Sequence, residues 1–452
     1  MQRQKKKRGR KKQRNASQDK GKERRIGSIS KKRITVLSRQ CGFEKHSKNK
    51  TRATSLITAF IAMMRTGEKS YLAWSRSLAS EIKETVSKQA IFEKMDEPWL
   101  TLLKLIIQEV VAMQSMKNVK QALLKHFKNV WIQDSTSIKL PGVMVEKFKG
   151  NISLGEQKSV AKINVVLNVL TGLCPVMNLM GLTVNEQQLS DSILSIAQAG
   201  DLVIRDLGYA VLAVFIAMDD AGIFFVSRLK YNVGLYDVQT GDKIELTQLL
   251  KGKSYSDIKV KCGKKEQFEV RLIAIKLSPE QAAERRRKAK KDRDKRLNHS
   301  DDYYALLDYV IFITNVEQKI WNYKEVAQAY SVRWNIEILF KSWKSGFKIE
   351  DMIPDDNTHT VRVEGYIYLM LLYIAWFLQI IFVPLRWAVE EQYGKQLSII
   401  KTVNYVMANF HNWLFEDIDK KDIAQLAYFC SYDKRRRPNA VADLDLFYKQ
   451  FA

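Results

Sequence analysis

The sequence predicts an α/β protein whose core is preceded by a helical region and interrupted by a β-rich insertion. Two observations support this. Apolar residues recur every three or four positions in residues 53–127, which is typical of helices, and from about residue 128 the pattern changes to short apolar runs and two-residue alternation, which is typical of strands. The chain has 452 residues, 46% of them hydrophobic, enough for two or three domains with a sizeable core.

Six segments follow from these patterns. They are a disordered basic tail (1–33), a helical N-terminal DNA-binding region (34–127), the first part of the core (128–230), a β-rich insertion with a basic helix (231–305), the second part of the core (306–400) and a C-terminal helical region (401–452).

The tail is predicted from its charge. The chain has 75 Lys and Arg against 49 Asp and Glu, a net charge of +26. Residues 1–52 hold 21 basic and three acidic residues, so 21 − 3 = +18 lies there and 26 − 18 = +8 in the rest. Such a field favours nucleic acid or an anionic membrane surface as the partner. The tail could be a targeting address or a DNA-contacting arm, and the sequence leaves both open.

The core is predicted from short β-forming runs. Strands are expected at 130–140, 202–206, 223–230 and 309–316, with a hairpin around Thr171-Gly172 and a polar helical stretch at 186–199. The insertion adds two strands around a Gly263-Lys264-Lys265 turn, followed by a basic helical stretch at 284–296.

Residues 365–385 are apolar enough to span a membrane. Three tyrosines along the segment, the interruption at Gln379 and the absence of a second such segment favour a buried helix instead. The four cysteines form no C-x-x-C pair, so a zinc ribbon is not expected and a reducing cytosol is the natural compartment. His46 and His299 lie in basic polar stretches and are expected to be solvated.

The most informative residues are Tyr330, Arg333, Glu337 and Lys344. On one α-helix with Tyr330 at zero, the other three fall at about −60°, −20° and −40°, within a stripe about 21 Å long. An adjoining arc is apolar and is the expected core face; it comprises Val332, Ile336, Leu339, Phe340 and Trp343. A lone carboxylate between two cations and a phenol suits a metal ligand with phosphate-holding neighbours. The alternative is a solvated face with ordinary ion pairs.

Two further carboxylates end or interrupt predicted strands, Asp134 and Asp206. Three converging carboxylates repel one another unless a cation lies between them. Hard divalent cations such as Mg²⁺ take oxygen ligands, and two such ions can stabilise both the attacking and the leaving oxygen of a displacement at phosphorus. Arg205, beside Asp206, could neutralise such a site or simply end the strand; the second interpretation is favoured.

The basic stretch contains a run of cations that could contact DNA phosphates: Arg285, Arg286, Arg287, Lys288, Lys290 and Lys291. A solvated helix is the alternative. Trp334 and Trp343 lie off the polar stripe and are not expected to stack on bases. No P-loop motif occurs, so ATP hydrolysis is not indicated.

In these motifs the chain resembles the bacterial insertion-sequence DDE transposases that carry a Y-x2-R-x3-E-x6-K signature. Asp134-Ser135-Thr136 is similar to the first aspartate box, and Asp206-Leu207-Gly208-Tyr209 to the second. Tyr330, Arg333, Glu337 and Lys344 match every position of the third. The resemblance covers roughly residues 40–430, and the long basic tail departs from it.

The resemblance implies an RNase H-like core and cut-and-paste transposition in a bacterial, nucleoid-associated setting. It implies Asp134, Asp206 and Glu337 as catalytic ligands of Mg²⁺, for which Mn²⁺ can substitute. Tyr330, Arg333 and Lys344 would position DNA phosphates. The partners would be double-stranded DNA, as terminal inverted repeats and target, and a second copy of the chain in a synaptic homodimer. A structure-specific endonuclease on the same core and a non-catalytic repeat-binding protein are the alternatives.

Overall fold

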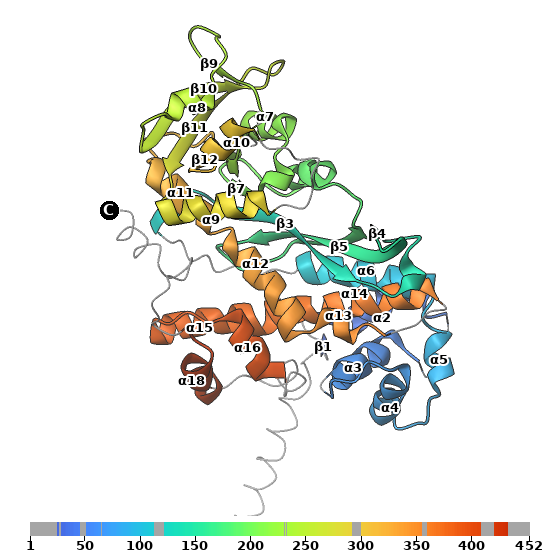
Figure 1. Ribbon diagram of the computed structural model, residues 1–452. Coiled ribbons are helices and arrows are strands. Elements are labelled where there is room, and N and C mark those ends of the chain that lie inside the picture. Colours follow the sequence, from blue (N-terminus) through green and yellow to red (C-terminus); the bar gives the residue numbers. More distant parts are fainter. Residues whose placement is uncertain are drawn as a thin grey trace, which may run out of the picture. The chain divides into compact units, whose positions relative to one another are not determined.

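The structure is a computed structural model. It describes residues 25–26, 29–45, 51–64, 66–112, 122–229, 231, 233–291, 300–354, 359–407 and 420–432 (Figure 1). The chain divides into two compact units. Unit 1 comprises Met1–Met113, Asp351–Leu385 and Asn404–Gln425, and unit 2 comprises Gln114–Glu350, Arg386–Val403 and Leu426–Ala452.

Unit 1 is helical, as predicted for the N-terminal region. Its helices include α2 (Lys31–Gln40), α3 (Ala53–Met64), α4 (Tyr71–Ile82), α5 (Lys88–Phe92), α6 (Glu97–Ala112) and α14 (Thr360–Trp376). Residues at the predicted helical spacing, such as Leu56 and Leu102, are fully buried. The long helix α14 packs against α6 and α3. Residues 351–385, which sequence patterns assign to the second part of the core, therefore cluster with the N-terminal helices.

Part of the predicted basic tail is folded. Two short strands, β1 (Arg25–Ile26) and β2 (Ile29–Ser30), pair antiparallel, and α2 starts at Lys31. The Ser30 hydroxyl caps α2 by accepting a hydrogen bond from the Arg33 backbone N–H at 3.1 Å. The range 1–33 is therefore not a uniform tail, and residues 1–24 lie outside the part of the chain that the structure describes.

The apolar segment at 365–385 forms a buried helix, as the sequence favoured. Helix α14 continues through a π-helical turn, η6 (Phe377–Phe382), into α15 (Val383–Tyr393). The continuous helix is long and apolar enough to cross a membrane, but 83% of its most apolar window is buried inside the protein. Its tyrosines follow the same pattern, since Tyr366 and Tyr373 are each 1% exposed.

Unit 2 is built on one mixed sheet of ten strands (Figure 1). The strands are β3 (Val130–Lys139), β4 (Lys149–Ser153), β5 (Glu156–Asn168), β6 (Val176–Gly181), β7 (Leu202–Arg205), β8 (Phe224–Arg228), β9 (Leu235–Asp237), β10 (Tyr255–Cys262), β11 (Phe268–Lys276) and β12 (Tyr309–Thr314). Their order is β4-β5-β3-β7-β8-β12-β11-β10-β9, with β6 also paired to β5. The β3–β7 and β7–β8 pairs are parallel and the others antiparallel.

The predicted strands and hairpin are confirmed. Strands β5 and β6 pair antiparallel, and Gly172 in their connection has φ +78°, a left-handed conformation that glycine adopts at little cost. The insertion does not form a separate sheet. Its strand β11 pairs with β12, with Leu272 opposite Ile313, so the β-rich insertion extends the sheet of the core.

The other helices lie in unit 2 or cross the boundary between the two units in the chain. They are η1 (Ala122–Leu124), η2 (Gly142–Met144), η3 (Glu186–Ser195), η4 (Leu207–Tyr209), α7 (Leu212–Asp220), α8 (Leu246–Leu250), α9 (Pro279–Lys290), α10 (Asp301–Leu306), α11 (Tyr323–Ser331), α12 (Trp334–Lys341), the π-helical η5 (Ser342–Gly346), α13 (Ile349–Met352), α16 (Ile399–Val406) and α18 (Lys420–Phe429). The polar helical stretch expected at 186–199 is thus a 3₁₀ helix over Glu186–Ser195.

The single α-helix expected over 330–344 is wrong in detail. Helix α11 ends at Ser331, α12 begins at Trp334, and the chain turns π-helical from Ser342. At the join the Arg333 N–H donates to the Tyr330 carbonyl at 3.0 Å, a hydrogen bond spanning three residues instead of four. Side chains three apart eclipse in such a 3₁₀ turn, which places Arg333 over Tyr330. The apolar arc from Val332 to Trp343 is buried as predicted.

Candidate active site

The sheet register brings the two aspartates together. Strands β3 and β7 are parallel, and Gln133 pairs with Arg205. The next residue along the chain after each of these is an aspartate, so Asp134 and Asp206 lie side by side where β7 ends. Asp134 is held inside the long central strand β3, whereas Asp206 follows the last residue of the short strand β7. This explains how residues 72 positions apart share one site.

Glu337 reaches the same site from α12, which packs on β3. The joining group is the Arg333 guanidinium. Its Nη2 lies 2.5 Å from Glu337 Oε1, its Nη1 3.4 Å from Asp134 Oδ2, and its Nε 4.0 Å from Asp206 Oδ1. The Arg333 side chain is only 14% exposed. Three carboxylates from three separate elements therefore surround one largely buried cation, as charge repulsion among them requires.

Tyr330 completes this side of the cluster. Its hydroxyl donates to Asp206 Oδ1 at 3.1 Å, and its ring lies 5.9 Å from the Arg333 guanidinium carbon. Burial, with the neighbouring Asp206 charge, raises the pKa of the Tyr330 phenol. Tyr330 is therefore a neutral donor at physiological pH, and it orients the Asp206 carboxylate.

The electrostatics of the site single out Asp134. Burial raises the pKa of its carboxyl to about 6, against the hydrogen bond from the Ser135 N–H and the charge of Arg333, which both lower it. Asp206 and Glu186 raise it further. Arg333 alone does not fully compensate the negative charge of the carboxylates, so a net negative charge remains at the site unless another cation binds.

Lys344 is the one signature residue that is not drawn into the cluster. It lies in the π-helical turn η5, and its side chain is exposed. Within the described residues, no contact joins Lys344 to any of the three carboxylates. It remains available to a ligand that approaches the carboxylates from solvent.

The carboxylates fit a divalent cation in chemistry. Carboxylate oxygens are the ligands that Mg²⁺ and Mn²⁺ prefer. Their spacing is set by the guanidinium between them, and among the described residues no group of three or more Asp, Glu, His or Cys is arranged to hold a metal ion. The donor set is therefore suitable, while its geometry is that of an arginine-filled cluster.

Residues 284–290 of the basic stretch lie in α9, which begins with a capping box at Ser278 and Pro279 in the first turn. Residues 292–296 of the stretch lie outside the described residues. Two of its arginines are used inside the protein. Arg285 donates to the Tyr309 carbonyl at 2.6 Å and to the Tyr231 hydroxyl at 3.1 Å, and Arg286 pairs with Asp308. The other cations of the run, Arg287, Lys288, Lys290 and Lys291, are exposed. Arg287 pairs with Glu284 on the surface, and Lys290 lies over the Tyr304 ring.

Behind the aspartates lie two polar residues, of which sequence reasoning considered Arg205 and missed Gln133. Gln133 and Arg205 point away from the carboxylates, toward η3. The fully buried Arg205 donates to the Gln133 side chain, to Ser190 and to the Tyr209 carbonyl, and burial lowers its pKa to about 9. Arg205 is therefore a structural residue of the strand. The signal in the sequence was the change from apolar to polar residues at Gln133, inside a predicted strand.

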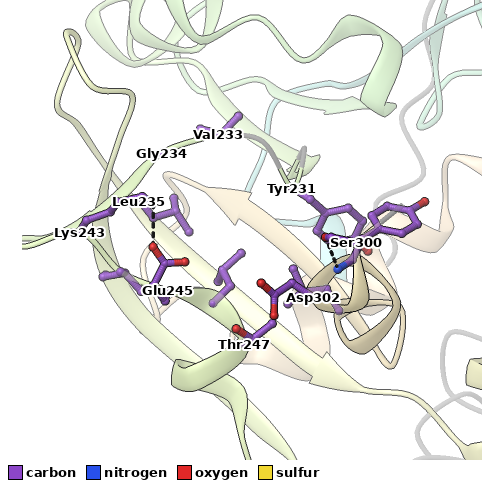
Figure 2. Close-up of a pocket in the computed structure, with 13 residues that line it drawn as sticks. Tyr231, Val233, Gly234, Leu235, Lys243, Glu245, Thr247, Ser300 and Asp302 are labelled. Atoms are coloured by element: carbon purple, nitrogen blue, oxygen red, sulfur yellow. Dashed lines mark hydrogen bonds and ion pairs between the residues drawn. The ribbon is translucent and has the colours of Figure 1, made fainter. Parts of the chain in front are cut away.

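The insertion contains a cavity of about 510 Å³ (Figure 2). It lies between the start of β9, α8 and α10, with Tyr231 on one side and the Lys243–Glu245 ion pair on another. None of the three carboxylates lines it. The cavity is thus not part of the candidate active site.

Comparison with known proteins identifies the family of the chain. Residues 125–358, which include all three carboxylates, match the Transposase DDE domain family. The chain is 25% identical over 358 residues to the transposase for insertion sequence element IS231B of Bacillus thuringiensis subsp. berliner, covering 74% of each chain. It is 25% identical over 364 residues to the transposase for IS1151 of Clostridium perfringens, covering 76% of this chain and 70% of that one. The solved piggyBac transposase synaptic complex with hairpin DNA shares 10% identity over 92% of this chain and 85% of that one, with a TM-score of 0.42, too low to bear on the fold.

The matched domain spans just over half of the chain, so the chain belongs to the DDE transposase family. Its curated relatives make it, more particularly, a transposase of the bacterial insertion-sequence type, an enzyme that cleaves DNA and transfers strands.

Proposed function

We propose that this transposase binds the terminal inverted repeats of its element, cleaves the DNA there and joins the freed ends to target DNA, with Asp134, Asp206 and Glu337 as the catalytic carboxylates. The observation that carries the proposal is the convergence of these carboxylates, from two strands and a helix, on the Arg333 guanidinium. A cluster that already needs a cation is suited to Mg²⁺, or to Mn²⁺ in its place.

The sheet supports an RNase H-like core. Strands β6, β5 and β3 form an antiparallel unit, and β7 and β8 follow in parallel beside β3. Asp134 lies on the central strand of this arrangement and Asp206 at the end of the adjacent one. Of the other strands, β12 would then be the edge strand of the core, and β11, β10 and β9 would belong to its insertion.

The proposed reaction consists of two phosphoryl transfers. Water first attacks the phosphodiester at the element's end; the P–O bond to the 3′ oxygen breaks and that oxygen takes a proton. The freed 3′-hydroxyl then attacks a phosphodiester of the target, releasing a target 3′-hydroxyl. Mg²⁺, when bound, supplies positive charge that stabilises the attacking and leaving oxygens. No covalent protein intermediate is required.

The surrounding side chains have distinct proposed roles. Tyr330 holds Asp206 through its hydrogen bond, and Arg333 orients Glu337. Arg333 would contact a DNA phosphate by exchanging some of its carboxylate partners. Lys344, exposed beyond Glu337, would contact a phosphate directly.

The exposed cations of α9 are proposed to contact the DNA backbone. In Arg287, Lys288, Lys290 and Lys291 the charge faces solvent, where phosphates can reach it. Arg285 and Arg286 are also predicted DNA contacts, but in the free protein they anchor the helix to Tyr309 and Asp308. The helical region of unit 1 would supply recognition of the repeats, and a homodimer would bring two ends together.

The test uses Asp206→Asn and Glu337→Gln, which remove a charge but nearly keep the shape. Each variant should bind DNA carrying the element's ends as the unchanged protein does, yet lose Mg²⁺-dependent cleavage. Glu317→Gln, at an exposed ion pair with Lys319 in the same unit, is the control and should cleave normally. Retained nicking by either variant would remove that residue from the ligand set.

The same assay separates the alternatives. Cleavage without joining to added target DNA would indicate a structure-specific endonuclease. Specific binding without cleavage, in Mg²⁺ or Mn²⁺, would indicate a repeat-binding protein that has lost its chemistry.

A further inference from the structure

A fourth carboxylate, Glu186, lies at the start of η3 beside both aspartate segments. Its Oε1 accepts a hydrogen bond from the Ser135 hydroxyl at 2.7 Å. Ser135 follows Asp134 directly, and its N–H donates to Asp134 Oδ1 at 2.8 Å. Glu186 is therefore linked through one residue to the carboxyl of Asp134.

The other oxygen of Glu186 faces the second segment. Gly208 lies two residues after Asp206, and a Cβ at this position would come 2.0 Å from Glu186 Oε2. No side chain fits there while Glu186 keeps its place. One carboxylate thus spans the two segments, with Oε1 on the first and Oε2 against the second.

The negative charge of Glu186 is partly balanced by Lys162. Lys162 Nζ, on strand β5, lies 3.7 Å from Glu186 Oε1 and donates to the Val184 carbonyl at 2.9 Å. The Lys162 side chain is 11% exposed, against 32% for Glu186. This ion pair with a mostly buried lysine holds the Glu186 carboxylate in place.

Further along η3, Ser190 is held by the residue before Asp206. Arg205 donates to both the hydroxyl and the carbonyl of Ser190, and also to Gln133, the residue before Asp134. The Gln133 amide in turn donates to the Leu189 carbonyl at 2.9 Å. The 3₁₀ helix is therefore attached to the flanks of both aspartates.

We propose that Glu186 is a positioning residue of the transposition reaction, holding the Asp134 and Asp206 segments at a fixed separation through Ser135 and Gly208. The inference rests on the proposed function, because it assigns a purpose to the distance between two proposed catalytic carboxylates. A Cβ at position 208 would have to displace the Glu186 carboxylate, which makes this position a probe of the contact. Glu186 itself makes no contact with Arg333 within the described residues, so it acts through its neighbours.

The experiment compares Glu186→Ala, Glu186→Gln, Gly208→Ala and the Glu186→Ala/Gly208→Ala double variant. Glu186→Ala removes the link, and a displacement of about 1 Å can cost on the order of 100-fold in rate. Glu186→Gln keeps an acceptor for Ser135 and the same length, so it should recover most of the rate. Gly208→Ala should slow cleavage because its methyl group displaces the Glu186 carboxylate.

The double variant is the sharpest test. Once Glu186 is alanine, the methyl group at 208 has no carboxylate to displace, so the double variant should be no slower than Glu186→Ala alone. The same non-additivity should appear in melting temperatures measured in EDTA, a readout that needs neither metal nor DNA. Cleavage rates are measured well below the melting temperatures, over a Mg²⁺ titration, with DNA affinity in parallel.

Each outcome is decisive. Single variants that cleave like the unchanged protein, rate losses that multiply in the double variant, or a Glu186→Gln variant as slow as Glu186→Ala would overturn the inference. Early melting with an unchanged maximal rate and Mg²⁺ midpoint would show a merely structural role and would also overturn it. If the unchanged protein failed to cleave, the proposed function would fail instead.

Discussion

Asp134→Asn should make the metal-free protein more stable at neutral pH, although it removes a proposed catalytic group. Burial raises the pKa of the Asp134 carboxyl from 3.8 to about 6, so ionising it in the folded state is unfavourable. The amide carries no charge and has nearly the same shape. The substitution therefore relieves a cost that the unchanged protein accepts at its candidate active site.

The magnitude follows from the pKa. A shift of roughly two units at about 1.36 kcal/mol per unit corresponds to about 3 kcal/mol. The side chain is 17% exposed, so little of this is lost to solvent screening. However, an amide oxygen can satisfy only one of the two donors that Asp134 now meets, the Ser135 N–H and Arg333. Losing one such bond costs about 1 kcal/mol, which leaves a net gain of about 1–2 kcal/mol.

The pH dependence has a definite sign. The pKa of Asp134 is higher in the folded state than in the unfolded state, so the folded state binds the proton more tightly. The stability contributed by protonated Asp134 is therefore complete below about pH 3.8 and is lost as the pH rises through about 6. The asparagine variant has no such proton. Its advantage should be largest above pH 6 and should disappear near pH 4.

The assay is urea unfolding and thermal melting in EDTA at several pH values from 4 to 7.5. Asp237→Asn is a control of opposite sign, since hydrogen bonds from the Thr240 and Gln239 N–H groups lower the pKa of that exposed carboxyl. It should be neutral or destabilising at pH 7.5. An Asp134→Asn variant less stable than the unchanged protein at pH 7.5, or a difference independent of pH, would refute the reasoning.

Three further predictions concern the cations. Arg333→Ala should destabilise the metal-free protein at pH 7.5 by about 1–3 kcal/mol, because it leaves partly buried carboxylates without their counter-ion. Mg²⁺ should therefore raise the melting temperature of this variant more than that of the unchanged protein. Equal shifts in melting temperature would argue against a site shared by Arg333 and the metal. The double variant Lys288→Ala/Lys291→Ala should weaken binding to all DNA sequences alike, and the slope of log affinity against log salt concentration should fall by about two. Arg286→Ala breaks the ion pair with Asp308, so it should instead lower the melting temperature. Deleting residues 1–24 should likewise lower general DNA affinity and flatten its salt dependence while sparing cleavage at low salt; loss of preference for one sequence at unchanged general affinity would show that the tail reads bases.

The sequence by itself determined the type and order of the elements. Strands β3, β7, β8 and β12, the β5–β6 hairpin and the helical N-terminal region were all predictable from local patterns, because burial on one or both faces of a sheet imposes a readable alternation. Asp134, Asp206 and Glu337 were nominated by their places in those patterns and by the resemblance of the motifs. The matched transposase domain agrees with that assignment of family.

Only the tertiary structure decided how these residues meet. A helical wheel placed Arg333 as a phosphate-holding companion of Glu337, but the 3₁₀ turn between α11 and α12 directs its guanidinium to all three carboxylates. The parallel register of Gln133 with Arg205 sets the two aspartates side by side, and no local pattern encodes a register between strands 72 residues apart. The contact between Glu186 and Gly208 could not be predicted from the sequence, because a close approach between two segments depends on packing and leaves no periodic pattern in the chain.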